Sequence, residues 1–286
     1  MTIILLVRHG QASFGSNDYD KLSHIGEQQA RLTGERLRQL SRPPGAALSG
    51  TLRRQADTAR LALEEARLVQ DPAFDEYSAT ALFRRYAPST PLDELRGDAR
   101  RFQENLMSVT DAWLTDASPE DARGGVESWQ SFRARVRAGL GMVVRRLGKD
   151  DTAVIFTSGG VIGAALGDAL GLTASRAVAL SWRVLNASVT ELSFGRSGFS
   201  LAGFNDVGHL RRAGAAAMEL GSWPSRAPLQ HLKQLRSLAV PVELLANKRD
   251  QVHRRGELAP WLRSMQERHP FAEYVPMSAK TAKDVE

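Results

Sequence analysis

The aliphatic run IILLV at positions 3–7 leads directly into Arg8, His9 and Gly10. A short run of this kind is typical of a buried β-strand, and Gly10 is expected to end it. Because open α/β sheets bind their ligands beyond the carboxyl ends of strands, Arg8 and His9 are placed where a ligand would lie. Taken alone, the three residues fit a solvated strand end equally well, so the rest of the chain must decide.

Arg8 and His9 are a chemically suitable pair for receiving a phosphoryl group. An imidazole nitrogen can attack phosphorus and form a covalent intermediate. A guanidinium group is always charged and can hold two phosphate oxygens at once. Phosphoryl transfer depends mainly on positioning and on neutralising charge, which such a pair supplies.

Strand and helix patterns alternate along the chain, and this alternation predicts an α/β fold. We expect a three-layer sandwich with a mainly parallel sheet and helices on both faces, followed by a small incomplete α/β tail. The expected strands cover residues 3–7, 46–49, 153–157, 189–194 and 199–204, and the last two form a hairpin. The expected helices cover residues 24–40, 51–65 and 159–170, with two more around 102–113 and 129–147, whose aromatic residues we assign to the core.

Three sequence blocks follow one another at a characteristic spacing. They are Arg-His-Gly at 8–10, Leu-Ser-x-x-Gly-x-x-Gln-Ala at 22–30, and Ser-x-x-Leu-x-Arg at 49–54 with Thr58 downstream. In these blocks, residues 1–210 resemble the histidine phosphatase superfamily in its phosphoglycerate-mutase-like branch. The resemblance implies that fold and a metal-independent phosphatase activity without a cofactor.

The resemblance also implies roles for individual residues. His9 would attack phosphorus and become phosphohistidine, which water then hydrolyses, while Arg8 and Arg54 hold the phosphoryl oxygens. Glu76 matches the position of the acid that protonates the leaving oxygen. Its neighbour Asp75 is the alternative acid, and by residue type alone a solvated loop carboxylate is equally plausible for Glu76.

Further phosphate contacts are expected around the second glycine-rich turn. Gly159 begins an expected helix, where backbone N–H groups form a natural seat for an oxyanion. Gln11, directly after the Arg-His-Gly block, is expected to touch the substrate. Arg53 is expected at the surface, His24 at a helix start, and His209 in a structural role.

Ser158 is the one clear departure from the family pattern. Relatives carry a second histidine in a block such as Ser-His-Gly-Gly-x-Ile, whereas this chain reads Thr-Ser-Gly-Gly-Val-Ile at 157–162. A serine can donate a hydrogen bond to the phosphoryl group, but it brings no positive charge. Because losing a charge-assisted donor can cost about 10²–10³ in rate, a catalytically weak phosphate-binding protein is a rival hypothesis.

Composition restricts the partners of the chain. The net charge is +6, but the arginines are scattered among carboxylates, so we predict no nucleic-acid partner and only a mild preference for anionic substrates. No apolar stretch approaches the ~20 residues of a membrane span, so no membrane partner is expected. A small phosphorylated substrate is the expected partner, and the oligomeric state is left open.

Cysteine is absent and the six histidines are dispersed, which argues against disulfides and against a metal site. The N-terminal run is too short for a signal peptide, so a cytoplasmic location is expected.

The last part of the chain carries a separate resemblance. We place a domain boundary near residue 220, a linker at 221–228, and a fragment at 229–286. Strand patterns at 240–246 and 272–277 are followed by Asn-Lys-x-Asp and Ser-Ala-Lys, as in the guanine-reading half of an Era-type GTPase. The nucleotide-binding candidates are Asn247, Lys248, Asp250, Ser278 and Ala279.

This tail has no phosphate-binding loop, because the pattern Gly-x₄-Gly-Lys-Ser/Thr does not occur in the chain. We therefore expect a fragment without GTP hydrolysis rather than a working G domain. The leading hypothesis is a histidine phosphatase that acts on a phosphomonoester or a phosphoprotein. Mutase activity is less favoured, and the rivals are a phosphate-binding protein and a GTP-binding module.

Overall fold

The computed structural model describes residues 1–13, 20–63, 68–90, 99–118, 125–148, 150–213, 243–246 and 273–276. The chain divides into two compact units, Met1–Trp223 and Pro224–Glu286. The expected linker at 221–228 lies outside the described residues. Among the helices that are described, none is both long and apolar enough to cross a membrane.

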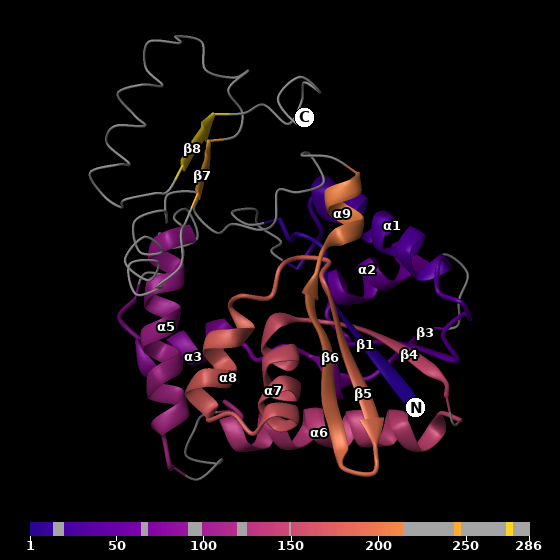
Figure 1. Ribbon diagram of the computed structural model, residues 1–286. Helices are drawn as coiled ribbons and strands as arrows, with labels where there is room; N and C mark the ends of the chain where they lie inside the picture. Colours follow the sequence, from indigo (N-terminus) through magenta and orange to yellow (C-terminus); the bar gives the residue numbers. More distant parts are fainter. Residues whose placement is uncertain are drawn as a thin grey trace. The chain divides into compact units, whose positions relative to one another are not determined.

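The first unit is built on a six-stranded sheet with the strand order β3-β2-β4-β1-β5-β6 (Figure 1). Its elements in chain order are β1 (Thr2–Arg8), α1 (His24–Arg38), β2 (Ala46–Ser49), α2 (Arg53–Leu63), β3 (Leu68–Gln70), the 3₁₀ turn η1 (Pro72–Phe74), α3 (Ala79–Tyr86), α5 (Ala99–Thr115), α6 (Trp129–Arg146), β4 (Thr152–Thr157), α7 (Gly159–Leu170), α8 (Ala174–Ser181), β5 (Val189–Gly195), β6 (Gly198–Asp206) and α9 (Gly208–Arg212). Strands β3, β2, β4 and β1 run parallel, and β5 is antiparallel to both of its neighbours. The α/β prediction is therefore confirmed.

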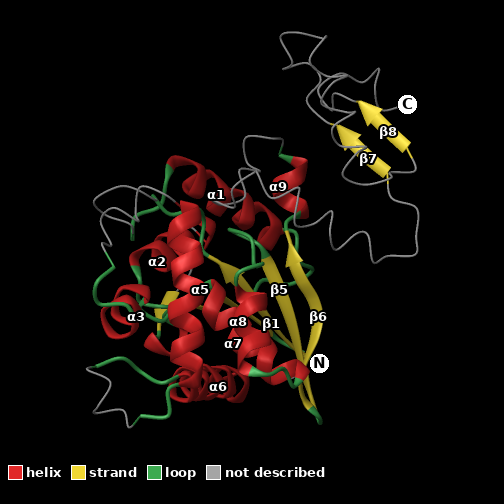
Figure 2. Ribbon diagram, turned by 90° about the vertical axis from the view of Figure 1, so that its left-hand side faces the viewer, coloured by secondary structure: helices red, strands yellow, loops and turns green. Residues whose placement is uncertain are grey.

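Alternation along β1 divides the core into two layers. Leu5 and Val7 pack with apolar residues of α1 and α2 on one face of the sheet. Ile4 and Leu6 face the other side, where the larger cluster contains residues from α3, α5, α6, α7 and α8. Figure 2 shows this second group of helices gathered in front of the sheet. Because all four side chains are at most 5% exposed, β1 is a central strand, as its unbroken aliphatic run predicts.

The aromatic residues of α5 and α6 belong to the larger core, as expected. Trp113 is 1% exposed and lies 5.5 Å from Trp129 between ring centroids, at a perpendicular angle. Phe132 is fully buried and contacts both rings. These rings therefore stabilise the packing of α5 on α6 rather than lining a cofactor site.

Most expected elements are present with shifts of one or two residues at their ends. The helix expected over 24–40 ends at Arg38, and the helix expected from residue 51 begins at Arg53. The elements β3, η1, α3, α8 and α9 were not predicted. Each has at most eight residues, too few for a period to emerge from the sequence, although α8 does carry an N-cap in Thr173.

The second unit contains two described strands, β7 (Glu243–Ala246) and β8 (Glu273–Pro276). They pair in parallel, with Leu244 opposite Tyr274. The five nucleotide-binding candidates of the tail all lie outside the described residues.

Candidate active site

Three neighbouring parallel strands bring the predicted site residues to one edge of the sheet. His9 follows β1, Ser158 follows β4, and Arg54 lies in the first turn of α2, just after β2. Because β2, β4 and β1 are adjacent and parallel, their carboxyl ends meet. Contacts between these segments show that the side chains converge.

The ring of His9 is held in a defined tautomer. Its Nδ1 lies 2.7 Å from the carbonyl oxygen of Gly10, which can only accept a hydrogen bond, so Nδ1 carries the proton. In the neutral ring, Nε2 therefore keeps a free lone pair. The Nε–H of Arg54 donates to this atom at 3.2 Å. Nε2 is therefore the ring nitrogen of His9 whose lone pair could serve as a nucleophile.

The surroundings of His9 also keep it neutral. Its side chain is 4% exposed, and burial lowers its pKa well below the ordinary value of 6.5. The positive charges of Arg54 and Arg8 lower the pKa further, while the hydrogen bond to Gly10 opposes them. A neutral imidazole is the form that can attack phosphorus, so this electrostatic environment suits a nucleophile.

The backbone around His9 is fixed from two directions. Its N–H donates to the carbonyl oxygen of Thr157 on β4 at 2.8 Å. Its carbonyl oxygen accepts from the side chain of Asn186 and from the backbone N–H of Ala187, both at 3.2 Å. Ala187 has φ of 54°, which alanine rarely adopts, so this loop is held in a strained conformation at the site.

Arg54 contacts both His9 and a carboxylate. Its guanidinium contacts Asp20 Oδ1 at 2.6 Å, and the other oxygen of Asp20 accepts from the backbone N–H of Arg53 at 2.8 Å. Asp20 thus binds at the start of α2 and holds the arginine in place. Thr58 links the same helix to β1, because its hydroxyl donates to the carbonyl oxygen of Arg54 and accepts from the N–H of Gly10.

Arg8 is half-buried and donates a hydrogen bond to the carbonyl oxygen of Val184, in the loop between α8 and β5. Its charge acts on both His9 and Glu76. Arg53, in contrast, is exposed and pairs with Asp57 on the surface of α2, as expected.

Glu76 and Asp75 point to different partners. Glu76 Oε2 accepts from the backbone N–H of Gly160 at 2.8 Å, and Oε1 accepts from Tyr77 at 3.2 Å. Asp75 instead binds the hydroxyl of Thr51 at 2.6 Å and the backbone N–H of the same residue. The geometry therefore favours Glu76 over its neighbour as the acid of the site.

Burial raises the pKa of Glu76 above its ordinary value of 4.5. The hydrogen bond from Gly160 and the charge of Arg54 oppose this rise, with smaller contributions from Tyr77 and Arg8. A carboxyl group with a raised pKa keeps its proton to higher pH, which is what a general acid requires.

Ser158 lies at the N-cap position of α7, but its hydroxyl makes no capping hydrogen bond. It is 1% exposed, and its Oγ accepts from the side-chain amide of Gln55 at 2.8 Å. Gly159 opens α7 with its backbone close to Ser181, since a Cβ at Gly159 would lie 2.8 Å from that carbonyl oxygen.

Gln11 contacts the start of α1. Its backbone N–H donates to Gln29 at 2.9 Å, and its side-chain oxygen accepts from the hydroxyl of Ser23 at 2.8 Å. These contacts hold the side chain of Gln11 to the N-cap of α1. A contact of Gln11 with substrate stays a prediction.

The remaining histidines of the motif region have the expected surroundings. His24 is exposed in the first turn of α1. His209 is 5% exposed and lies 3.2 Å from the hydroxyl of Thr33 on α1. Burial and the charge of Arg36 lower the pKa of His209 to about 4, partly offset by Asp206. Within the described ranges, no group of three or more His, Asp or Glu residues could hold a metal ion.

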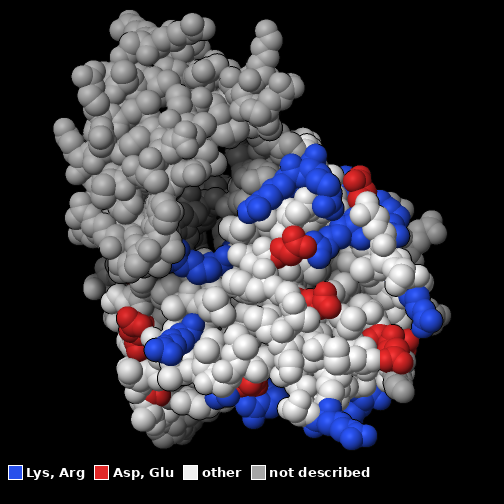
Figure 3. Space-filling view, in the orientation of Figure 1, with Lys and Arg blue, Asp and Glu red and all other residues white. Residues whose placement is uncertain are grey.

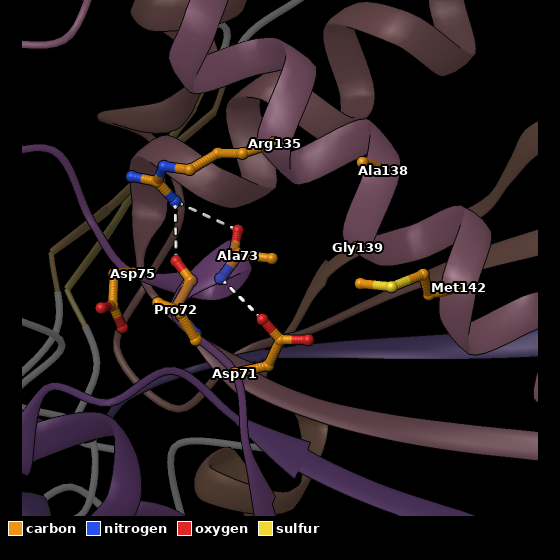
Figure 4. Close-up of a pocket in the computed structure, with 8 residues that line it drawn as sticks. All are labelled: Asp71, Pro72, Ala73, Asp75, Arg135, Ala138, Gly139 and Met142. Atoms are coloured by element: carbon orange, nitrogen blue, oxygen red, sulfur yellow. Dashed lines mark hydrogen bonds between the residues drawn. The ribbon is translucent and has the colours of Figure 1, made fainter.

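A pocket of about 500 Å³ lies between η1 and α6, beside the loop that carries Asp75 and Glu76 (Figure 4). Arg135 reaches from α6 to the carbonyl oxygens of Pro72 and Ala73, both at 3.1 Å. Asp75 lines this pocket, whereas His9, Arg54 and Glu76 do not. The pocket is therefore distinct from the convergent strand ends.

Charged side chains of both signs are interspersed on the face that Figure 3 shows. Several arginines are engaged by carboxylates, as where Arg133 and Arg137 both pair with Asp168. This mixture agrees with the expectation of scattered charge drawn from the sequence.

The sequence profile of the histidine phosphatase superfamily, branch 1, matches residues 4–207. The chain belongs to the histidine phosphatase superfamily. The match ends before the tail, so it lends no support to the resemblance of residues 229–286 to a GTPase. A comparison with curated proteins finds no match.

Several solved structures share the fold of this superfamily member. YhfR of Bacillus stearothermophilus is 20% identical with a TM-score of 0.55, and the alignment covers 73% of this chain and 99% of YhfR. A phosphoserine phosphatase mutant from Entamoeba histolytica, in complex with phosphoserine, is 19% identical with a TM-score of 0.53, covering 73% and 100%. A mycobacterial glucosyl-3-phosphoglycerate phosphatase in complex with VO3 is 25% identical with a TM-score of 0.51, covering 71% and 98%.

Sequence reasoning missed three side chains of the site. Asp20 and Gln55 were not assigned roles, although both lie beside recognised motif blocks. Asn186, near the end of the matched region, was not assigned a role either. Their contacts with Arg54, Ser158 and His9 depend on the tertiary fold, and only their proximity to motif residues could have drawn attention to them.

Proposed function

We propose that this protein is a phosphatase that transfers a phosphoryl group from a phosphomonoester to His9 and then to water. The observation that carries the proposal is the state of His9. Its Nδ1 is committed to Gly10, its Nε2 faces Arg54, and burial with two arginines keeps the ring neutral. This is a nucleophilic nitrogen placed beside a cation that can bind phosphate.

In the first step, the lone pair of His9 Nε2 attacks phosphorus and the bond from phosphorus to the ester oxygen breaks. Glu76 gives its proton to the departing oxygen, so the alcohol leaves neutral and Glu76 becomes a carboxylate. Arg8 and Arg54 balance the charge on the phosphoryl oxygens during the transfer. Arg54 must give up its hydrogen bond to Nε2 as that lone pair forms the new bond.

In the second step, water attacks the phosphorus of phosphohistidine. Glu76 takes a proton from the water, the nitrogen–phosphorus bond breaks, and its electron pair returns to Nε2. Inorganic phosphate leaves, and both His9 and Glu76 are back in their starting states. Ser158 supplies a neutral hydrogen bond to the phosphoryl group in the position where relatives carry a histidine.

The proposal is tested by turnover of p-nitrophenyl phosphate, comparing the wild type with His9→Ala. We expect His9→Ala to abolish turnover, and we expect wild-type protein quenched in alkali, where phosphohistidine survives, to carry phosphorus on His9. The matched control is His24→Ala, which removes an exposed histidine from α1 and should leave turnover unchanged. Unchanged hydrolysis by His9→Ala would contradict the mechanism.

A phosphate-binding protein of weak activity is the second candidate, and Ser158 is the observation that favours it. Its neutral hydroxyl stands where a charge-assisted donor is typical of the family. Wild-type protein that binds orthophosphate, turns over no p-nitrophenyl phosphate and forms no phosphohistidine would favour this candidate over the phosphatase.

The resemblance of the tail leaves a GTP-binding module as a rival hypothesis, although the missing phosphate-binding loop favours a fragment without function. Parallel pairing of β7 with β8 is compatible with an α/β sheet but does not single out a nucleotide fold. Titration with GDP and ADP tests this hypothesis, and equal or absent binding of the two nucleotides would refute it.

A further inference from the structure

Gln55 is a buried polar residue that the phosphatase mechanism does not use. It follows Arg54 in the first turn of α2 and has no exposed surface. Its Nε2 donates to Ser158 Oγ at 2.8 Å and to the carbonyl oxygen of Phe74 at 3.1 Å. A buried amide that spans two loops of the site in this way calls for an explanation.

The contact with Phe74 fixes the orientation of the amide. A carbonyl oxygen can only accept hydrogen bonds, so the NH₂ end of Gln55 must face Phe74. The same NH₂ group therefore faces Ser158, and the hydroxyl of Ser158 acts as acceptor in that contact. Rotation of the amide would place two carbonyl oxygens against each other.

The oxygen end of the amide shows that this orientation has a free-energy penalty. Gln55 Oε1 is buried and has no hydrogen-bond partner among the residues that the structure describes. It lies against the backbone of Gly50, where a Cβ would come within 1.9 Å of it. An unpaired buried oxygen costs free energy, so the two donated hydrogen bonds must be worth retaining.

Ser158 consequently has a proton to offer. Its oxygen already accepts from Gln55, it does not cap α7, and no described residue accepts its hydroxyl proton. The hydroxyl is 1% exposed and lies at the convergent strand ends with His9 and Arg54. A phosphoryl oxygen bound there would be the missing acceptor.

We propose that Gln55 is a positioning residue that turns the hydroxyl of Ser158 into a hydrogen-bond donor for the phosphoryl group. Because the amide donates to Ser158 Oγ, Gln55 does not itself accept the hydroxyl proton of Ser158. This proton is then available for a hydrogen bond to a bound phosphoryl oxygen. The pair of Gln55 and Ser158 thus supplies a directed, neutral donor. This inference rests on the proposed phosphate site, but not on turnover.

A double-mutant cycle of Ser158→Ala and Gln55→Met tests the proposal, measured on kcat/KM for p-nitrophenyl phosphate and on the Kd for orthophosphate. We expect Ser158→Ala to reduce kcat/KM about 10²-fold, which is typical of removing one transition-state donor. Gln55→Met should reduce it about 10-fold, and the double variant should be no worse than Ser158→Ala alone. Phosphate affinity should show the same non-additivity.

Gln55→Glu is a second variant of nearly unchanged shape. An ionised carboxylate only accepts hydrogen bonds, so Ser158 would donate to it and lose the proton intended for the substrate. The carboxylate also loses the hydrogen bond to the Phe74 carbonyl oxygen, so only the part of its effect that passes through Ser158 should disappear when it is combined with Ser158→Ala.

Thr157→Val is the matched control, because the Thr157 hydroxyl is the other donor to the Phe74 carbonyl, at 2.7 Å, and has no contact with Ser158 Oγ. Combined with Ser158→Ala, it should give additive effects. If the effects of Gln55→Met are additive as well, Gln55 only supports the loop and the proposal is overturned.

Failure of the phosphatase function gives a different result. If the wild type shows no turnover, the cycle on orthophosphate Kd alone decides the role of Gln55. Non-additive losses of affinity support the positioning role, and additive losses or a wild type that binds no orthophosphate overturn it.

Discussion

Gly160→Ala is the sharpest perturbation of the proposed general acid. The N–H of Gly160 donates to Glu76 Oε2 at 2.8 Å, so the carboxyl group lies directly against this glycine. A Cβ at position 160 would lie 2.0 Å from Glu76 Oε1 and 2.6 Å from Tyr77 Cε1. The substitution therefore acts on the acid without removing any functional group from the site.

The size of the effect follows from that distance. Ordinary van der Waals contact begins near 3.4 Å, so the carboxyl oxygen must withdraw by about 1.4 Å. A displacement of about 1 Å in a catalytic group can cost on the order of 10²-fold in rate. Overpacking of this kind also costs roughly 1–3 kcal/mol in the free energy of unfolding.

Leaving groups of different acidity separate the loss of acid catalysis from general damage. p-Nitrophenolate departs readily without a proton, whereas the more basic phenolate gains from protonation by Glu76. We expect Gly160→Ala to reduce kcat/KM for phenyl phosphate about 10²-fold and that for p-nitrophenyl phosphate less than about 10-fold.

Gly163→Ala is the control on the same helix. Its Cβ would meet the carbonyl oxygen of Ala177 and the Cβ of Ser181, each at 2.6 Å, with no atom of Glu76 among the nearest contacts. It should lower stability by a similar amount and leave the ratio of the two substrates unchanged. Equal losses of both substrates in Gly160→Ala would refute the assignment of Glu76 as the acid.

Three further predictions follow from the charges of the site. The pH profile of kcat/KM should be bell-shaped, because His9 must be neutral and its lowered pKa sets the acidic limb, while Glu76 must be protonated and its raised pKa sets the basic limb. An acidic limb at or above pH 6.5, or a basic limb at or below pH 4.5, would contradict this. Ser158→His should increase both the affinity for orthophosphate and the turnover of p-nitrophenyl phosphate by about 10-fold or more, because it restores a charge-assisted donor. Unchanged values in a folded variant would show that position 158 does not contact phosphate. The pKa of His209 is about 4 in the folded protein and 6.5 in the unfolded protein, so the unfolded state takes up the proton first as pH falls. The free energy of unfolding should therefore drop by at most about 3 kcal/mol between pH 6.5 and 4. Denaturant titrations of His209→Gln should lack this part of the pH dependence.

The sequence predicts which strand ends and helical turns carry the candidate site residues, because these elements depend on local sequence patterns. The buried run at 3–7 specifies a central strand, and the motif spacing places His9, Arg54 and Ser158 directly after strands or in a first helical turn. Parallel pairing of β2, β4 and β1 then brings the three residues together. Few alternative arrangements satisfy both the strand–helix alternation and the right-handed crossover rule.

The contacts that orient these residues are not encoded locally. Gln55 and Ser158 are 103 positions apart, and Asp20 and Arg54 are 34 apart. A glutamine on a helix is usually solvated, and nothing in the residues around Gln55 shows that it is buried. The choice between Asp75 and Glu76 likewise depends on whether Thr51 or Gly160 is nearby, which only the tertiary structure determines.

The serine at position 158 also changes how charge is distributed in the site. The pKa of His9 is already lowered by Arg54 and Arg8, and a third cation beside it would lower that pKa further. The same cation would favour ionised Glu76 and so leave less of it protonated, just as the two arginines already oppose its raised pKa. In the proposed site, a neutral donor oriented by Gln55 keeps Glu76 protonated to higher pH at the expense of weaker phosphate binding. Under the proposed mechanism, this balance favours substrates whose leaving oxygen needs a proton, because Glu76 still carries its proton at higher pH.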